Sequence, residues 1–244
     1  MSLGKMLLKM LFPPRCPFCR EILGGISWEK VDYPDWVRKE SASGVICSRC
    51  AVSLPWIVMG CPRCAAEQMG RVDCSCSVYD YAFDNCCAVG RYTGKVRKAL
   101  HLFKYQQKQW LAEPLGRLLS WKLSSLDWAG TIEAVVPIPL TPHRQRRRGY
   151  NQAALLAGVV GRELGVPLLD ILQRVRETES QAGLKREKRW ENMRDAFRCR
   201  GETGRYGHLL LIDDILTTGA TAHQAASVIK TGVAESVSVA VFAR

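Results

Sequence analysis

The second half of the chain alternates short apolar runs with segments whose apolar residues recur at helical spacing. Such runs are typical of strands buried on both faces, and strand–helix alternation indicates a parallel sheet covered by helices. We therefore predict an α/β fold. The predicted strands are 133–140, 166–172, 207–214 and 236–243, and the predicted helices are 220–232 and 151–165, the latter capped by Asn151 and ended by Gly165.

The first half has a different pattern. Segment 94–127 has apolar residues at helical spacing and is predicted to form two helices divided at Pro114, because proline disrupts a helix interior. We expect Trp110, Trp121 and Trp128 to pack against the core. Residues 1–80 are rich in turn-forming residues and cysteine. The predicted division is therefore a cysteine-rich module at 1–80, a helical hood or connector at 81–130 and an α/β domain at 131–244.

Composition narrows the function classes. A hydrophobic fraction of 47% is sufficient for a core, and a formal net charge of +12 favours phosphorylated or polyanionic partners. Residues 140–200 contain 14 Lys/Arg and 7 Asp/Glu, so +7 of the net charge lies in one quarter of the chain. This excess could form either a solvated surface or a phosphate site. No window approaches the ~20 apolar residues of a membrane span, and the opening MLLKMLF lacks a cleavage signature. We expect a cytoplasmic protein.

Ten of the eleven cysteines lie before residue 90, and eight of them form close pairs. Because the sequence has no evident signal peptide and its second half is poor in cysteine, metal binding accounts for them better than disulfides do. Two pairs of thiolates complete a tetrahedral zinc site, and closed four-thiolate sites are usually structural. We predict one site from Cys16, Cys19, Cys47 and Cys50, and a second from Cys61, Cys64, Cys74 and Cys76.

The ligand set of the second site stays open at this point. Cys74 and Cys76 are separated by one residue rather than two, which weakens them as a chelating turn. Either could be idle, or Cys86 or Cys87 could substitute for it. Otherwise we expect Cys86, Cys87 and Cys199 to be core thiols.

The stretch LLLIDDILTTGAT, residues 209–221, carries the strongest chemical signal. Ligands of open parallel sheets bind beyond the carboxyl ends of strands, which is where Asp213 and Asp214 are expected. The following loop enters a helix and so offers free amides, threonine hydroxyls and a flexible glycine to a phosphate. Paired acids beside such a loop suit vicinal hydroxyls, so the stretch predicts a pocket for a ribose 5-phosphate. We expect Asp214 to face solvent.

This stretch resembles the fingerprint of type I phosphoribosyltransferases, which bind 5-phosphoribosyl-1-pyrophosphate (PRPP). Together with YTGKVRKALHLFKY, VPIPLTPHRQRRRGYNQAALLA, TESQAGLKREKRWENMRDAF and the final VAVFAR, the chain resembles the ComF family of competence-related proteins along nearly its whole length. The resemblance implies a type I phosphoribosyltransferase-like fold, with a mostly parallel sheet flanked by helices, preceded by a small zinc-ribbon module. The 27-residue loop of the first cysteine group and the CxC pair depart from the family's pattern.

The resemblance also implies site residues. Asp213 and Asp214 would hold the ribose hydroxyls, and the loop around Arg144 and Arg148 would lie near the pyrophosphate. Residues 181–192 would form a mobile lid, and magnesium would accompany PRPP on the ligand's own oxygens. The catalytic residues would be Asp213, Asp214 and Arg148, and the 5-phosphate would be held by Thr217, Thr218, Gly219, Ala220 and Thr221. Independently of the resemblance, His143 is the candidate among the four histidines because it follows the first strand of the α/β half; the alternative is a surface histidine with no role.

Three functions fit the sequence. The protein could transfer phosphoribose to an unidentified nitrogen acceptor, because charge separation at C1 needs mainly positioning and electrostatics. It could be a PRPP-responsive protein that binds single-stranded DNA during uptake, with Tyr150, Trp190 and Phe197 stacking bases among the arginines. The fold could also be only a scaffold. Other competence proteins and a second copy of the chain are further possible partners.

Overall fold

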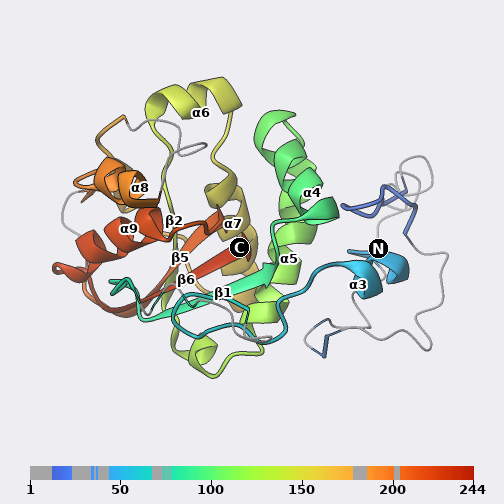
Figure 1. Ribbon diagram of the computed structural model, residues 1–244, viewed down its shortest axis with the longest axis horizontal. Helices are drawn as coiled ribbons and strands as arrows, with labels where there is room; N and C mark the ends of the chain where they lie inside the picture. Colours follow the sequence, from blue (N-terminus) through green and yellow to red (C-terminus); the bar gives the residue numbers. More distant parts are fainter. Residues whose placement is uncertain are drawn as a thin grey trace.

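The computed structural model describes residues 13–23, 34–35, 37, 44–67, 74, 76, 78–177, 186–200 and 204–244. Its centre is a four-stranded parallel sheet in the order β1-β6-β5-β2 (Figure 1). The strands are β1 (Asn85–Gly90), β2 (Ala134–Pro137), β5 (Tyr206–Ile215) and β6 (Ala234–Ala243). This arrangement confirms the α/β fold and three of the predicted strands, whereas β1 was not predicted from the sequence.

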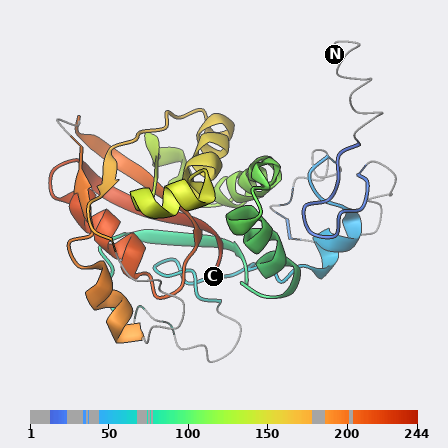
Figure 2. The same cartoon turned by 90° about the horizontal axis from the view of Figure 1, so that it is seen from above.

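Helices cover both faces of this sheet, as expected for parallel strands (Figure 2). Successive residues of β5 show the two faces, because Leu210 and Leu209 belong to different hydrophobic clusters. The Leu210 cluster includes α5 (Ala112–Leu123) and α7 (Gln152–Leu164), and the Leu209 cluster includes α9 (Ala220–Lys230). The predicted ends of α7 are confirmed: the Asn151 side chain accepts a hydrogen bond from Ala153 N, and Gly165 is left-handed at φ 73°.

The helices before the sheet domain divide at a different place from the one predicted. Helix α4 (Gly94–Tyr105) ends before a 3₁₀ turn, η2 (Gln109–Leu111), and α5 follows directly. Pro114 lies in the first turn of α5, where a missing N–H costs nothing because those amides have no partner within the helix. Trp121 is buried and Trp128 packs on the core, but Trp110 is 40% exposed, so its predicted core position is wrong. Another 3₁₀ turn, η3 (Asp127–Thr131), leads into β2.

Segment 166–172 is not the strand that was predicted. Leu168 makes one isolated parallel bridge to Val135, where Val135 N donates to Pro167 O and Leu169 N donates to Val135 O, each at 2.9 Å. The strand that follows, β3 (Leu172–Arg174), pairs with β4 (Phe197–Cys199) in a separate antiparallel ribbon. Helix α8 (Arg186–Met193) precedes β4 and covers residues 186–192 of the predicted lid, whereas residues 181–185 lie outside the described part of the chain.

The described cysteine-rich segments lie against the sheet domain. Phe18 packs on Phe242 of β6 with ring centroids 6.2 Å apart, and the Arg20 guanidinium stacks over Trp110. Residues 55–62 cover the outer edge of β1: Ile57 N donates to Val89 O at 3.0 Å, and Cys86 N donates to Pro62 O at 2.7 Å. A short helix, α3 (Ser48–Ser53), lies in the first cysteine segment. No described helix is long and apolar enough to cross a membrane.

Candidate functional site

A cleft of about 540 Å³ opens at the carboxyl ends of β2 and β5. It is bounded by the end of β5, by the loop that enters α9, by α6 (Pro142–Arg148) and by the last turn of α4. The described part of the chain therefore brings acids, hydroxyls, amides and arginines to one place. The predicted site residues that line it are Asp213, Asp214, Thr217, Gly219, Ala220, Thr221, Arg144, Arg148 and His143.

The two acids lie at the end of β5, where Asp214 is buried and ion-paired and Asp213 is partly exposed and lines the cleft. Asp214 is 5% exposed, and its Oδ2 lies 2.9 Å from the Nζ of Lys104, which comes from the last turn of α4. The expectation that Asp214 faces solvent is therefore wrong. Its position near the end of a buried strand turns the carboxylate inward, and a lysine 110 positions earlier in the sequence compensates its charge.

The charges of this cluster perturb one another. Burial raises the pKa of Asp213 to about 7, and the neighbouring Asp214 carboxylate adds to the rise while Lys104 opposes it. Burial disfavours the Lys104 ammonium, but the attraction of Asp214 and Asp213 outweighs it, so the pKa of Lys104 is raised. The Asp214 amide donates to Asp213 Oδ1 at 2.8 Å. Residues in a cleft whose pKa values are shifted by burial and by specific neighbouring charges are typical of functional sites.

The loop between β5 and α9 depends on a glycine. Gly219 has φ +83°, and a Cβ added there would lie 2.5 Å from Cε1 of Tyr81. The Tyr81 hydroxyl also donates to the backbone oxygen of Thr218 at 2.9 Å. Tyr81 thus holds the loop in place by packing against Gly219 and by its hydrogen bond to Thr218. Its exposed edge presents Thr217 and Thr221, together with the amides at the start of α9, to the cleft.

Thr218 takes a different position from its neighbours. Its side chain is buried, and its Oγ1 accepts a hydrogen bond from Ala220 N at 3.4 Å. Thr218 is also absent from the residues that line the cleft, although it lies between two that do. The Thr218 hydroxyl therefore supports the backbone of the loop and does not line the cleft.

Helix α6 supplies the arginines. Thr141 caps it by accepting from Arg144 N at 3.3 Å, Gly149 ends it with φ 81°, and none of its residues is buried. The Arg148 guanidinium lies 5.1 Å from the ring of Tyr105 in α4 and donates to Gln152 Oε1 at 2.9 Å. Arg144 is half-buried, and this partial burial, followed by the positive charge of Arg148, lowers the pKa of Arg144. Cations held this close together favour an anion between them.

Arg174, at the end of β3, was not singled out by the sequence. It is 7% exposed and lines the cleft, and its guanidinium lies 5.5 Å from the ring of Phe197. Burial lowers its pKa to about 10, and the charge of Arg144 adds to the effect. Lys104 was missed as well. Arg174 lies in a strand of three residues, which is too short to give a sequence pattern, and Lys104 carries no local signal beyond an apolar helix face.

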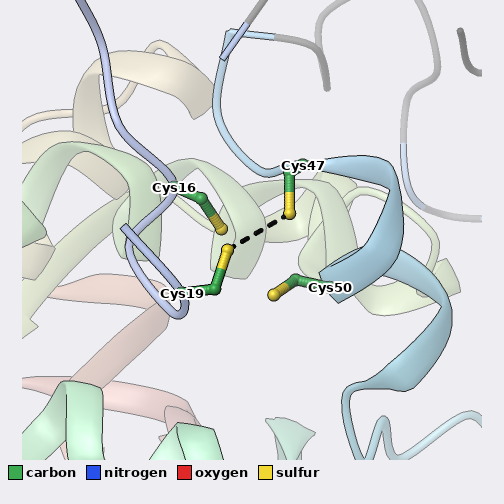
Figure 3. Close-up of side chains that lie close together, drawn as sticks. All are labelled: Cys16, Cys19, Cys47 and Cys50. Atoms are coloured by element: carbon green, nitrogen blue, oxygen red, sulfur yellow. Dashed lines mark hydrogen bonds between the residues drawn. The ribbon is translucent and has the colours of Figure 1, made fainter. Parts of the chain in front are cut away.

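The first cysteine group has the donor set of a four-thiolate metal site (Figure 3). Cys16 and Cys19 come from a turn, while Cys47 and Cys50 come from the start of α3, and all four sulfur atoms lie within 4.8 Å of one another. The Cys19 and Cys47 sulfurs are 3.4 Å apart. Thiolates on one tetrahedral zinc ion are about 3.8 Å apart, so the group fits such an ion.

The second group is Cys61, Cys64, Cys74 and Cys76, also within 4.8 Å. The Cys61 and Cys76 sulfurs are 3.6 Å apart, and those of the CxC pair are 2.7 Å apart. Both members of this pair therefore face the group. Cys86 and Cys87 are buried in β1, one in each hydrophobic cluster, so they are core thiols as expected, and Cys199 is half-buried. Both cysteine groups could bind a metal such as zinc.

The aromatic residues of the basic segment do not form an exposed stacking surface. Tyr150 is buried and donates a hydrogen bond to the backbone oxygen of Phe103, and Phe197 is also buried. Trp190 is half-buried and stacks on Tyr79 with ring centroids 4.6 Å apart. Base stacking by these three side chains is therefore not supported, because each already packs within the protein.

Similar proteins point to one group. The chain is 29% identical over 228 residues to competence protein F of Haemophilus influenzae, covering 91% of this chain and 93% of that protein. It is 27% identical to the DNA utilization protein YhgH of Escherichia coli (75% of this chain, 83% of the relative). It is 29% identical to competence protein ComFC of Bacillus subtilis (73% and 75%).

No family model matches the sequence. Among solved structures, adenine phosphoribosyltransferase of Leishmania tarentolae aligns with 56% of this chain and 58% of its own, at 16% identity and a TM-score of 0.34. At that score the structural likeness adds nothing to the sequence matches, which cover 73–91% of this chain. The chain is a homologue of competence protein F, YhgH and ComFC, which confirms the resemblance to the ComF family.

Proposed function

We propose that the cleft binds PRPP. Asp213 and Asp214 would hold the ribose hydroxyls, the loop at residues 217–221 would hold the 5-phosphate, and Arg144 and Arg148 would lie at the pyrophosphate. One observation carries the proposal: a pair of acids, an amide-rich loop and arginines surround a single cleft at the carboxyl ends of parallel strands.

Lys104 and Arg174 extend this proposal beyond the residues expected from the sequence. Lys104 offsets one of the two negative charges, so that an anionic ligand can approach the acids. Arg174 adds a buried cation whose guanidinium geometry matches phosphate oxygens. Magnesium would accompany PRPP on the ligand's own oxygens and neutralise its phosphates.

Transfer of phosphoribose would use the same charges. Breaking the bond from C1 to pyrophosphate places positive charge on the ribose and negative charge on the leaving group. The acids would lie on the ribose side, and Arg144, Arg148 and Arg174 would lie on the side of the leaving group, so each charge would be stabilised where it develops. An enzyme would release pyrophosphate only when the acceptor is present, whereas a PRPP sensor would bind without turnover.

Calorimetric titration of PRPP with magnesium tests the binding proposal. Arg148→Gln removes a cleft cation, and Arg97→Gln, at an exposed position of α4 outside the cleft, is the charge-matched control. We expect Arg148→Gln to weaken binding about tenfold and Arg97→Gln to leave it unchanged, since a charge-assisted hydrogen bond contributes roughly that factor. Equal affinity of the two variants, or no binding by the unaltered protein, would contradict the proposal.

A second candidate function is binding of single-stranded DNA in DNA uptake. Two features favour it: helix α6 carries four arginines with no buried residue, and two relatives are named competence proteins while a third is named for DNA utilization. Affinity for an oligonucleotide should fall steeply with salt and persist without PRPP. Absence of binding at low salt would exclude it. Homodimerisation and association with other competence proteins stay predictions.

We also propose that zinc occupies both cysteine groups as a structural ion. A soft four-thiolate donor set suits zinc, and closed sites of this kind stabilise folding rather than catalyse reactions. The first group would fix the segment that packs on α4 and β6, and the second would fix the segment that carries Tyr81. Metal analysis of protein purified without added zinc would test the assignment: two zinc ions per chain are expected.

A further inference from the structure

Helix α6 separates two clefts. The first cleft is lined by four residues of this helix, His143, Arg144, Arg147 and Arg148. Their spacing places them on one face of the helix. Pro142, Gln145 and Arg146 line a second cleft of about 620 Å³. Because these positions fall on the opposite face of the same helix, the second cleft lies on the other side of α6, between α6 and the β3–β4 ribbon.

The lining of the second cleft combines basic and apolar residues. Its cations are Arg146, Arg174 and Arg200. The only carboxylate among its lining residues is Asp170, whose Oδ2 lies 3.2 Å from Arg200, so the lining keeps an excess of positive charge. Its apolar part consists of Pro137, Pro139, Pro142, Leu140 and Leu168, and Leu168 is 42% exposed.

This combination selects a class of ligand. Guanidinium groups bind phosphate oxygens in a bidentate manner, whereas proline rings and leucine side chains offer flat apolar contacts. The volume is within the range of about 300–1,000 Å³ that small-molecule sites occupy. A ligand with a phosphate at one end and a planar, weakly polar ring at the other would match both parts of the lining.

We propose that the second cleft binds a nucleotide, with its phosphate on Arg146 and Arg200 and its base against Leu140, Leu168 and the prolines. This site is distinct from the proposed PRPP site and does not depend on it. The same nucleotide chemistry is offered by a free mononucleotide and by one unit of a single-stranded polynucleotide.

Arg174 connects the two clefts. It lines both of them and is 7% exposed, so its side chain is part of the wall that they share. An anion in either cleft would compete for the same cation, because the charge of one guanidinium cannot fully compensate two phosphates. We therefore expect PRPP to weaken nucleotide binding in the second cleft, and the nucleotide to weaken PRPP binding by the same factor.

Adjacent arginines of α6 give a matched test. Arg146 lines only the second cleft and Arg147 lines only the first, so Arg146→Gln and Arg147→Gln change the charge of the same helix by the same amount. The probes are deoxyadenosine monophosphate and a single-stranded oligodeoxynucleotide, titrated calorimetrically at one fixed salt concentration. We expect Arg146→Gln to weaken probe binding about tenfold and Arg147→Gln to leave it within about twofold.

A third variant, Leu168→Glu, tests the apolar wall. It places a carboxylate where the base would lie, on a partly exposed side chain, and should abolish probe binding without unfolding the protein. Circular dichroism and thermal unfolding would verify that each variant is folded. Binding of the mononucleotide identifies a free nucleotide as the ligand, whereas binding of the oligonucleotide alone identifies a polynucleotide.

The proposal is overturned if neither probe binds, or if Arg146→Gln and Arg147→Gln weaken binding equally, since equal losses indicate a non-specific charge effect. Titration of PRPP into the same variants keeps the two proposals separate. Unchanged PRPP binding by Arg146→Gln is expected, because that side chain lies outside the first cleft. Failure of PRPP to bind the unaltered protein would leave the second-cleft result standing.

Discussion

Replacing Lys104 by methionine would leave two adjacent carboxylates in a buried cluster without their nearest cation. The Nζ of Lys104 lies 2.9 Å from Asp214 Oδ2, and the two side chains are 17% and 7% exposed. At an effective dielectric constant of about 20, unit charges at that distance attract by roughly 6 kcal/mol. Part of this attraction is offset in the unaltered protein by the cost of removing both charges from water.

The expected loss of stability is about 3 kcal/mol at pH 8, at the lower end of the roughly 3–5 kcal/mol for breaking a buried pair. We choose the lower end because the cluster opens to a cleft that also contains Arg144 and Arg148. For a chain of this size the loss corresponds to a fall in Tm of roughly 6–12 °C. Methionine keeps most of the side-chain volume, so packing contributes little to the change.

The loss should depend on pH in a defined direction. The pKa of Asp213 is already raised to about 7, and removal of Lys104 would raise it further. Lowering the pH from 8 to 5.5 protonates this carboxyl in the folded variant, which removes one of the two adjacent negative charges, so the difference in stability from the unaltered protein should shrink.

Thermal unfolding at both pH values, in buffer containing zinc, measures the effect. Lys98→Met is the matched control, because Lys98 is exposed on the same helix, and it should change Tm by less than about 2 °C. A loss below about 0.5 kcal/mol in Lys104→Met, or a loss that is equal at pH 8 and pH 5.5, would refute the argument that the pair is buried and electrostatically coupled.

Three further outcomes are expected. Between about pH 4 and pH 7 the folded state holds a proton on Asp213 that the unfolded state has lost, so this group lowers stability as pH rises, and Asp213→Asn should flatten that slope in urea unfolding. Gly219→Ala should lower the free energy of unfolding by roughly 1–3 kcal/mol and weaken PRPP binding, because Gly219 has a φ of +83° and an added Cβ would meet Tyr81. The control Gly130→Ala should change neither quantity, because nothing lies within 4 Å of the added Cβ. Equal effects of the two variants would refute the steric reason. Cys64→Ser should remove one of two zinc ions per chain by elemental analysis and Cys199→Ser none; unchanged zinc in Cys64→Ser would exclude the second site.

Local patterns predicted the parts of the fold that depend on local chemistry. Helix α7 formed between the predicted cap and stop because Asn151 and Gly165 satisfy the backbone at its two ends without help from distant residues. The strand that carries Asp213 and Asp214 was also predicted, since a long apolar run can be buried on both faces in only a few ways.

The features that were missed depend on contacts between distant residues. Strand β1 is short, and nothing in its six residues distinguishes it from a loop until β6 lies beside it. The burial of Asp214 depends on Lys104 in another helix, so the sequence could place the acid at the end of a strand but could not show which side chain would face it. The exposure of Trp110 likewise depends on where α4 ends.

The late pairing of β1 limits how the protein can fold during synthesis. Asn85 pairs with Ser238, so β1 has no neighbour in the sheet until a strand about 150 residues further along has been made. Contacts of such long range close slowly, since the loop entropy is lost before the contact forms. Until then β1 and its two buried cysteines are exposed as an unpaired, apolar segment. Cysteine groups that bind metal early would hold residues 55–62 near β1 and shield one edge of it while the rest of the sheet is completed.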